Sequence, residues 1–284
     1  MQGSTFVTWG LTFAGATAVA VLAASLYRVR LDLQASRRDL ARKDAELSFA
    51  LEVQRALFPR SLPDKEGLQF SGICIPARGI SGDFYDVMRL PDGRLVFAIA
   101  DISGKGISAA ILMANLQALL RSLTETLDCP REICSKLNRH LHNVTDSTRF
   151  ATFFYAEWHP VQRTIRYVNA GHHSPVFLRS SIQAKSNGRL DTGGVPLGMF
   201  PDADFQTGEV KLEEGDLLVL YSDGVTEAES EMGEDFGDQR LRQVIAANRE
   251  KPLGEIQSTI LEAVRKWSGQ EQEDDMTLLL VRAV

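Results

Sequence analysis

Residues 95–110 read LVFAIADISGKGISAA, and this stretch decides the fold. The apolar run Leu95–Ala100 is typical of a buried strand. The run closes at Asp101, and Gly104 and Gly106 follow before a helical stretch begins. A carboxylate at a strand end beside glycine can approach a ligand closely, because glycine lets the backbone come near. Asp101 is therefore a candidate functional residue at the edge of a sheet.

Three further aspartates lie where the sequence changes between apolar and acidic. Asp223 follows the apolar run Leu217–Tyr221, Asp274 precedes the run Met276–Val281, and Asp83 lies in the segment SGDFYD. Several converging carboxylates need a cation to offset their repulsion, and sites made only of oxygen suit Mg²⁺ or Mn²⁺. The four aspartates together predict metal-assisted chemistry.

The secondary structure expected around these aspartates is a run of strands interrupted by pairs of helices. The expected strands are Leu68–Ile75, Leu95–Ala100, Ala151–Trp158, Thr164–Ala170, Val176–Arg179, Gly208–Leu212, Leu217–Tyr221 and Met276–Val281. The expected helices are Ser108–Leu127, Arg131–Val144, Gln239–Ala247 and Leu253–Trp267. Strands and helices that do not alternate strictly indicate a layered α+β fold.

Composition places the chain among ordinary globular proteins. Its 284 residues are 44% apolar and 24% charged, and the net charge of −6 argues against a nucleic-acid partner. Thirteen acidic residues and a single base lie between Asp202 and Asp238, and we interpret all of them except Asp223 as a solvated surface. The three cysteines lack a metal-finger spacing, which favours reduced thiols in a cytosolic domain.

The N-terminal segment predicts a membrane anchor. Residues 6–27 form a run of 22 residues without a charged side chain, long enough as a helix to cross a bilayer. A cleaved signal peptide is the alternative, but the run lacks a basic region before it and exceeds the usual length. Six basic residues follow within 28–43, which favours a cytoplasmic location for the rest of the chain. We expect a single-pass protein of the cytoplasmic membrane, with residues 1–27 as its anchor and its input from a partner protein.

Residues 28–58 contain neither glycine nor proline and predict one continuous helical linker. Leu26, Leu33, Leu40 and Leu47 recur every seven residues, as in a coiled coil, although Ser36 and Lys43 fall on the second core position. An amphipathic helix that lies on its own catalytic domain explains the pattern equally well. A homodimer or a membrane partner that binds through residues 6–58 is therefore an open expectation.

The ordered motifs of residues 51–284 resemble the metal-dependent serine/threonine protein phosphatases, the PPM family. The resemblance is to the bacterial branch that acts in sigma-factor partner switching, in stress or developmental signal transduction. Each motif is weak alone, and all of them in order are specific. They are PARGISGDFYD at 76–86, ADISGKGISAA at 100–110, NAGH at 169–172, GVPLG at 194–198, GDLLVLYSDGVTEA at 215–228 and DDMT at 274–277.

The resemblance implies an αββα fold, a central antiparallel β-sandwich flanked by helices, in a phosphatase domain at 59–284. It also implies two Mn²⁺ or Mg²⁺ ions, with Asp101 bridging both. Asp223 and Asp274 hold one ion, while Asp83 and the backbone carbonyl of Ile102 hold the other. The implied reaction is attack of an activated water on phosphoserine or phosphothreonine of an anti-sigma-factor antagonist, with Asp101 and Asp83 as the catalytic residues.

For some residues near the predicted metal ligands, the sequence leaves two interpretations open. Arg78 lies five residues before Asp83, where some relatives carry a phosphate-binding arginine, and a surface ion pair is the alternative. Asp86 and Asp275 are expected either to support the metal ligands or to be solvated, rather than to bind metal themselves. His172 and His173 are expected in a turn rather than in acid–base roles.

Two other functions are compatible with paired carboxylates or with a tethered domain. A metal-dependent nucleotidyl cyclase would use similar carboxylates, but the sequence offers no segment suited to bind a base or a triphosphate. A catalytically idle scaffold at the membrane would tolerate loss of metal-site aspartates, and the chain retains all four.

Overall fold

The computed structural model describes residues 3–63, 67–77, 79–145, 148–180, 189–269 and 272–284. The chain forms two compact units, residues 1–50 and residues 51–284. Arg78 lies outside the described residues, so its expected contact with phosphate stays a prediction.

Helix α1 runs without interruption from Gly3 to Arg55 and contains the whole apolar run 6–27. The predicted linker helix extended to residue 58, and the structure ends it three residues earlier. The residue before Pro59 is disfavoured in helical conformation, and Leu57 and Phe58 instead pack against buried core residues. The chain therefore leaves the helix where its side chains enter the core of the second unit.

In the described part of the chain, one helix is long and apolar enough to span a membrane by length and composition. It is α2, Ile107–Thr126. Most of the apolar run 6–27 lies outside the residues whose side chains the structure describes, so the membrane anchor stays a prediction. Helix α2 buries a row of side chains, among them Met113, Leu116 and Leu120, in the core of the second unit. Its apolar character is that of a core helix.

Two sheets form the centre of residues 51–284. The first has the strand order β1 (Leu68–Ile75), β10 (Met276–Ala283), β9 (Leu217–Tyr221) and β6 (Val176–Leu178). The second has the order β2 (Phe84–Arg89), β3 (Leu95–Ile102), β4 (Ala151–His159), β5 (Thr164–Ala170) and β7 (Gly193–Gly194), and β8 (Gly208–Lys211) also pairs with β5. The pairings described are antiparallel apart from β5 with β7.

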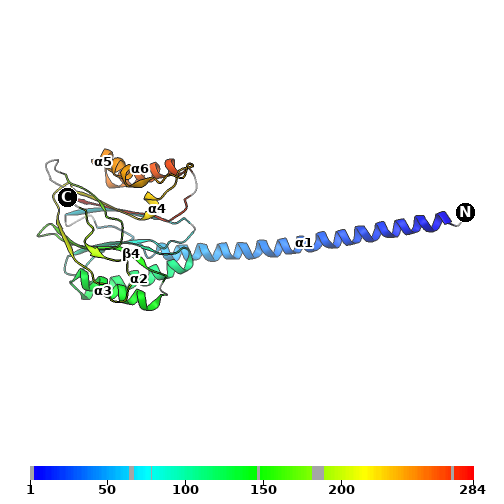
Figure 1. Cartoon of the computed structure of the whole chain (residues 1–284), viewed down its shortest axis with the longest axis horizontal. Coiled ribbons are helices and arrows are strands. Elements are labelled where there is room, and N and C mark those ends of the chain that lie inside the picture. Colours follow the sequence, from blue (N-terminus) through cyan, green and yellow to red (C-terminus); the bar gives the residue numbers. More distant parts are fainter. Residues whose placement is uncertain (1–2, 64–66, 78, 146–147, 181–188, 270–271) are drawn as a thin grey trace. The chain divides into compact units, whose positions relative to one another are not determined.

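Helices cover the outer faces of the two sheets. Helices α2 and α3 (Pro130–Val144) lie beside the second sheet, and α5 (Gly237–Asn248) and α6 (Leu253–Ser268) lie beside the first (Figure 1). Three hydrophobic clusters fill the spaces between these layers, one under each helix pair and one between the sheets.

Strand β3 is apolar from Leu95 to Ala100 because both of its faces are covered. Alternate residues point to opposite sides of a sheet. Val96, Ala98 and Ala100 join the cluster beneath α2 and α3, whereas Leu95, Phe97 and Ile99 join the cluster between the sheets. The same alternation holds in β10. The continuous apolar runs seen in the sequence are thus strands buried on two sides.

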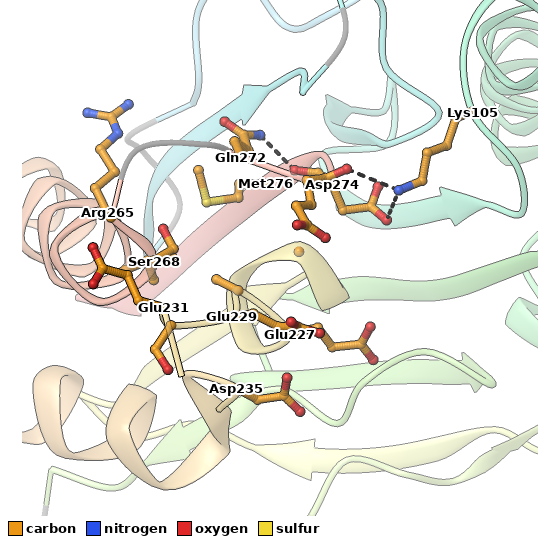
Figure 2. Close-up of a pocket in the computed structure, with 16 residues that line it drawn as sticks. Lys105, Glu227, Glu229, Glu231, Asp235, Arg265, Ser268, Gln272, Asp274 and Met276 are labelled. Atoms are coloured by element: carbon orange, nitrogen blue, oxygen red, sulfur yellow. Dashed lines mark hydrogen bonds and ion pairs between the residues drawn. The ribbon is translucent and has the colours of Figure 1, made fainter. Parts of the chain in front are cut away.

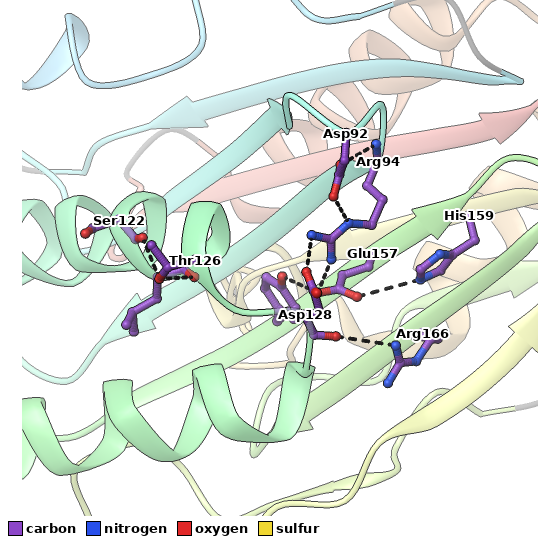
Figure 3. Close-up of polar contacts among 10 residues, drawn as sticks. Asp92, Arg94, Ser122, Thr126, Asp128, Glu157, His159 and Arg166 are labelled. Carbon is purple, nitrogen blue, oxygen red and sulfur yellow. Dashed lines mark hydrogen bonds and ion pairs between the residues drawn. The ribbon is translucent and has the colours of Figure 1, made fainter.

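A buried charged cluster lies at the far end of β4. Glu157 is fully buried, accepts a hydrogen bond from the Tyr155 hydroxyl at 2.8 Å and lies 3.5 Å from the Arg94 guanidinium. Arg94 also pairs with Asp92 and Asp128 (Figure 3). Burial raises the pKa of Glu157, and the Tyr155 hydrogen bond and the Arg94 charge oppose that rise.

The α+β class predicted from the sequence is confirmed, and three elements were missed. Strand β2 begins inside the motif at 76–86 and continues to Arg89, β7 has two glycines, and α4 (Asp223–Thr226) is a single turn. Two residues or one turn give no periodicity from which an element can be recognised. Asp101 lies inside β3, opposite Thr152, rather than just after the strand.

Candidate active site

The fold brings three of the predicted aspartates together from adjacent strand ends. Asp223 begins α4 directly after β9, Asp274 precedes β10, and these two strands pair side by side. Asp101 comes from the second sheet, one residue before the end of β3. The site therefore lies where the two sheets meet at one end of the domain.

The carboxylates interact strongly enough to perturb one another. Burial and then the negative charge of Asp223 raise the pKa of Asp101 to about 7. Burial and then Asp274 raise the pKa of Asp223. Burial and then Asp101 raise the pKa of Asp83. These directions are those of acids crowded in a site of low dielectric, where nearby positive charges only partly offset their repulsion.

Asp83 is the most deeply placed of the four carboxylates. It is 2% exposed, and its Oδ2 atom has no hydrogen-bond partner among the described residues; neither has the buried Thr277 hydroxyl. The carbonyl oxygen of Ile102 lies beside Gly82, the residue before Asp83. A Cβ added to Gly82 would approach this oxygen to 3.1 Å. The role of the Ile102 carbonyl as a metal ligand stays a prediction.

Asp274 carries an internal counter-charge. The Lys105 ammonium lies 2.8 Å from Asp274 Oδ2 and donates to the backbone carbonyl of Glu273 at 3.0 Å (Figure 2). Across the described ranges, no group of three or more His, Cys, Asp or Glu side chains is close enough to hold a metal ion as placed. The donor chemistry fits hard divalent cations, and Asp274 would have to leave Lys105 to contribute.

Asp275 holds the loop that carries Asp83. Its carboxylate accepts hydrogen bonds from the Ala77 and Gly82 backbone amides at 2.8 and 2.9 Å and from the Ser81 hydroxyl at 2.7 Å. Gly224 is required beside it, because a Cβ there would lie 2.2 Å from the Asp275 carbonyl oxygen. These contacts agree with the expectation that Asp275 supports the site from behind.

Asp86 is engaged away from the other carboxylates. It forms a two-pronged pair with Arg121 at 2.7 and 2.8 Å and accepts from Gln117 at 3.1 Å. Gln117 also donates to the Leu57 carbonyl just after α1. Asp86 thus joins β2 to α2 and to the end of α1, which agrees with a supporting role.

The last turns of α1 contact the Asp83 loop directly. The Gln54 amide donates to the Ser81 carbonyl at 2.7 Å and accepts from the Ser81 backbone amide at 2.9 Å. Gln54 is buried although its neighbours along the helix are exposed. Sequence reasoning missed this pair, because the two residues lie 27 positions apart and Gln54 belongs to no recognisable motif.

A cavity of about 580 Å³ opens beside Asp101 and Asp223. His172 and His173 line it, and His172 is buried, with its Nδ1 atom 2.8 Å from the Thr152 hydroxyl. Burial, then the neighbouring His173, lowers the pKa of His172 to about 3, so its ring is neutral at physiological pH. The expected turn is present at Gly171, whose φ is 70°.

Comparison with known proteins gives the same family as the motifs. The family described as Stage II sporulation protein E (SpoIIE) matches residues 91–284. The chain belongs to this family. It is 33% identical to the phosphoserine phosphatase RsbU of Bacillus subtilis over 84% of its own length and 70% of RsbU. It is 26% identical to the phosphoserine phosphatase RsbP of the same organism, over 83% of its length and 57% of RsbP.

Solved structures share the fold. The SiaA-PP2C domain of Pseudomonas aeruginosa superimposes with a TM-score of 0.72 at 20% identity, over 86% of this chain and 98% of that domain. RsbX in complex with magnesium gives a TM-score of 0.59 at 18% identity, over 79% of this chain and 99% of RsbX. The chain is a protein phosphatase of the PP2C type, and the resemblance inferred from its motifs is confirmed.

Proposed function

We propose that this chain is a membrane-anchored phosphatase that hydrolyses phosphoserine or phosphothreonine with two bound Mn²⁺ or Mg²⁺ ions. The observation that carries the proposal is the convergence of Asp83, Asp101 and Asp223, whose pKa values are raised by burial and by neighbouring aspartates. Asp101 and Asp223 would hold one ion together with Asp274, and Asp83 would share Asp101 and the Ile102 carbonyl for the other. When bound, such ions acidify a water for attack on phosphorus and neutralise the developing charge.

The protein side chains would supply order around that chemistry. Asp275 fixes the loop of Asp83 through its three hydrogen bonds. His172, neutral and buried, donates to or accepts from Thr152, the residue opposite Asp101 on β4. The Lys105 ammonium would partly neutralise Asp274 and Asp223 until a divalent metal ion binds them.

The test uses residues 51–284, which form a compact unit with their own core. We expect this fragment to release phosphate from a phosphoserine protein with Mn²⁺ or Mg²⁺ and not in the presence of a chelator. Asp101→Asn and Asp223→Asn should each abolish release while leaving the far-ultraviolet circular dichroism unchanged. Activity that survives both substitutions would rule out the proposal, and a wild-type fragment that binds Mn²⁺ no better than Asp101→Asn would favour an idle scaffold.

The proposed substrate is a small phosphorylated anti-sigma-factor antagonist. Support comes from the relatives RsbU and RsbP, which are named phosphoserine phosphatases, and from the partner-switching branch that the motifs resemble. Candidate antagonists phosphorylated on serine can be offered singly to the purified fragment. Release from an unrelated phosphoprotein at the same rate would contradict this substrate class.

The proposed location is the cytoplasmic membrane, through residues 6–27 of α1. The run is uncharged, 22 residues long and followed by six basic residues within 28–43. In cell fractionation the full chain should sediment with membranes after a carbonate wash, and residues 28–284 should not. Full-length chain in the soluble fraction would exclude the anchor.

The linker 28–58 is proposed to pair with a second copy or with a membrane partner. Leu33 and Leu40 are 54% and 61% exposed in the single chain, which leaves the predicted seam uncovered. Cysteines placed at these two positions should crosslink in membranes if the seam joins two copies, and should not if a different protein covers it.

A further inference from the structure

Two cavities flank the aspartate cluster, and their charges differ. The larger, of about 740 Å³, reaches Asp274 and Lys105 and is lined by acidic side chains from the α4–α5 segment and beyond (Figure 2). These are Glu227, Glu229, Glu231, Asp235 and Glu273. The other cavity, of about 580 Å³, is lined by four aspartates, Asp101, Asp191, Asp223 and Asp238, and by two arginines, Arg189 and Arg242. A phosphorylated substrate is an anion, so the two cavities receive it differently.

Arg242 is the most available cation of the second cavity. It lies on α5, is partly exposed, and has no hydrogen bond or ion pair to another residue in the described ranges. Arg189, across the cavity lining, has only a long contact of 3.6 Å to the exposed Asp191. A guanidinium without a protein partner in a cavity of ligand size is a ready site for a carboxylate or phosphate.

Both arginines line the same cavity as Tyr221, and their charges act on it. The Tyr221 hydroxyl donates to Asp238 at 2.7 Å, and Asp238 lies four positions before Arg242 on α5. Burial and Asp238 raise the pKa of Tyr221, and the charges of Arg242 and Arg189 oppose that rise. The cations that act on Asp223 are instead His173 and Lys105. The guanidinium groups are therefore placed for substrate groups beside the phosphoryl group.

We propose that Arg242, assisted by Arg189, is a specificity-determining residue that binds acidic side chains flanking the phosphoserine of the substrate. The substrate then occupies the cavity of Asp101 and Asp223 and avoids the acidic cavity of Figure 2. This inference rests on the phosphatase activity and adds to it the charge preference of the substrate. It also assigns a role to α5, which contributes no residue to the predicted metal ligands.

The experiment compares three substrates with the full-length chain in detergent. They are p-nitrophenyl phosphate and two phosphoserine peptides of equal length, one with glutamate and one with glutamine on both sides of the phosphoserine. Arg242→Ala should raise KM for the glutamate peptide about tenfold, the effect of losing one charge-assisted hydrogen bond. The kcat values, and the KM for the other two substrates, should stay within about twofold of the wild type.

Matched variants separate a local effect from a general one. Arg242→Lys should recover part of the loss, and Arg189→Ala should give a smaller loss because Arg189 already contacts Asp191. Arg265→Ala removes the same charge from the acidic cavity and should leave all three KM values unchanged. Thermal melting of each variant establishes that it is folded.

Three outcomes would overturn the proposal. They are an equal loss on all three substrates, no loss on the glutamate peptide, and a loss with Arg265→Ala in place of Arg242→Ala. Failure of the phosphatase function itself gives a different result, because wild-type chain would then release nothing from p-nitrophenyl phosphate.

Discussion

Asp275 shows how one side chain can govern a site without belonging to its predicted ligands. Its two carboxylate oxygens bind two backbone amides and one hydroxyl of the loop before Asp83. The substitution Asp275→Asn keeps the size of the side chain but replaces one acceptor oxygen with an amide NH₂ group. This group is a donor and faces donors of the loop. We expect the Mn²⁺ concentration for half-maximal activity to rise about tenfold or more, since hydrogen bonds to charged groups contribute about 1.5–3 kcal/mol each.

The control for Asp275→Asn is a buried acid in a separate network of hydrogen bonds. Asp216→Asn removes a buried carboxylate that binds the Ser180 and Glu213 amides in another turn, so it tests loss of a loop-binding acid elsewhere. It should lower the melting temperature without changing the Mn²⁺ requirement. An unchanged Mn²⁺ requirement in Asp275→Asn would show that the Asp83 loop keeps its position unaided.

At the scale of elements, the last turn of α1 is hydrogen-bonded to the loop that precedes Asp83. Gln54 makes two hydrogen bonds to the Ser81 backbone, so a change in the last turn of α1 reaches Asp83 through two residues. Gln54→Ala in residues 51–284 should lower activity at limiting Mn²⁺ by about tenfold and leave it nearly normal at saturating Mn²⁺. Glu52→Ala, an exposed change half a turn away, is the matched control. If the two variants show the same dependence of activity on Mn²⁺ concentration, the contact between α1 and the Asp83 loop does not affect the site.

Strand β4 contains the buried carboxyl group of Glu157, which makes the stability of the fold depend on pH (Figure 3). Burial raises its pKa above the ordinary value of 4.5 in the folded state, so the folded protein holds this proton more tightly than the unfolded chain. The stability that this proton contributes is complete below pH 4.5 and is lost as pH rises through the folded pKa. Relative to Glu157→Gln, the wild type should therefore gain free energy of unfolding as pH falls from 8 toward 5. Urea titrations at several pH values measure this, and parallel pH profiles would contradict it.

For the whole molecule, the sequence predicts what rests on continuous patterns and misses what rests on contacts between distant segments. The strands β3, β9 and β10 were predictable because their apolar runs are buried on both sides. Asp101, Asp223 and Asp274 were predictable because each lies beside such a run. The pairs Gln54 with Ser81 and Lys105 with Asp274 join residues 27 and 169 positions apart, and Arg242 lies on an ordinary amphipathic helix. No local pattern reveals that these pairs form, and none distinguishes Gln54 or Arg242 from solvated neighbours.

The continuity of α1 makes a prediction about regulation at the same scale. One helix extends from Gly3 to Arg55 and includes Gln54, so a rotation imposed on its N-terminal part would be carried to the Ser81 contact. Residues 1–50 can be replaced by a dimeric coiled coil in heptad register with Leu47, and then by the same coil with two residues inserted at the junction. The insertion turns the following helix by about 200°, since each residue turns an α-helix by about 100°. We expect the two fusions to differ several-fold in phosphate release at limiting Mn²⁺, because both dimerise and only the orientation of α1 changes. Equal activity in the two fusions would make residues 1–50 a passive tether, and the Gln54 contact would then serve stability alone.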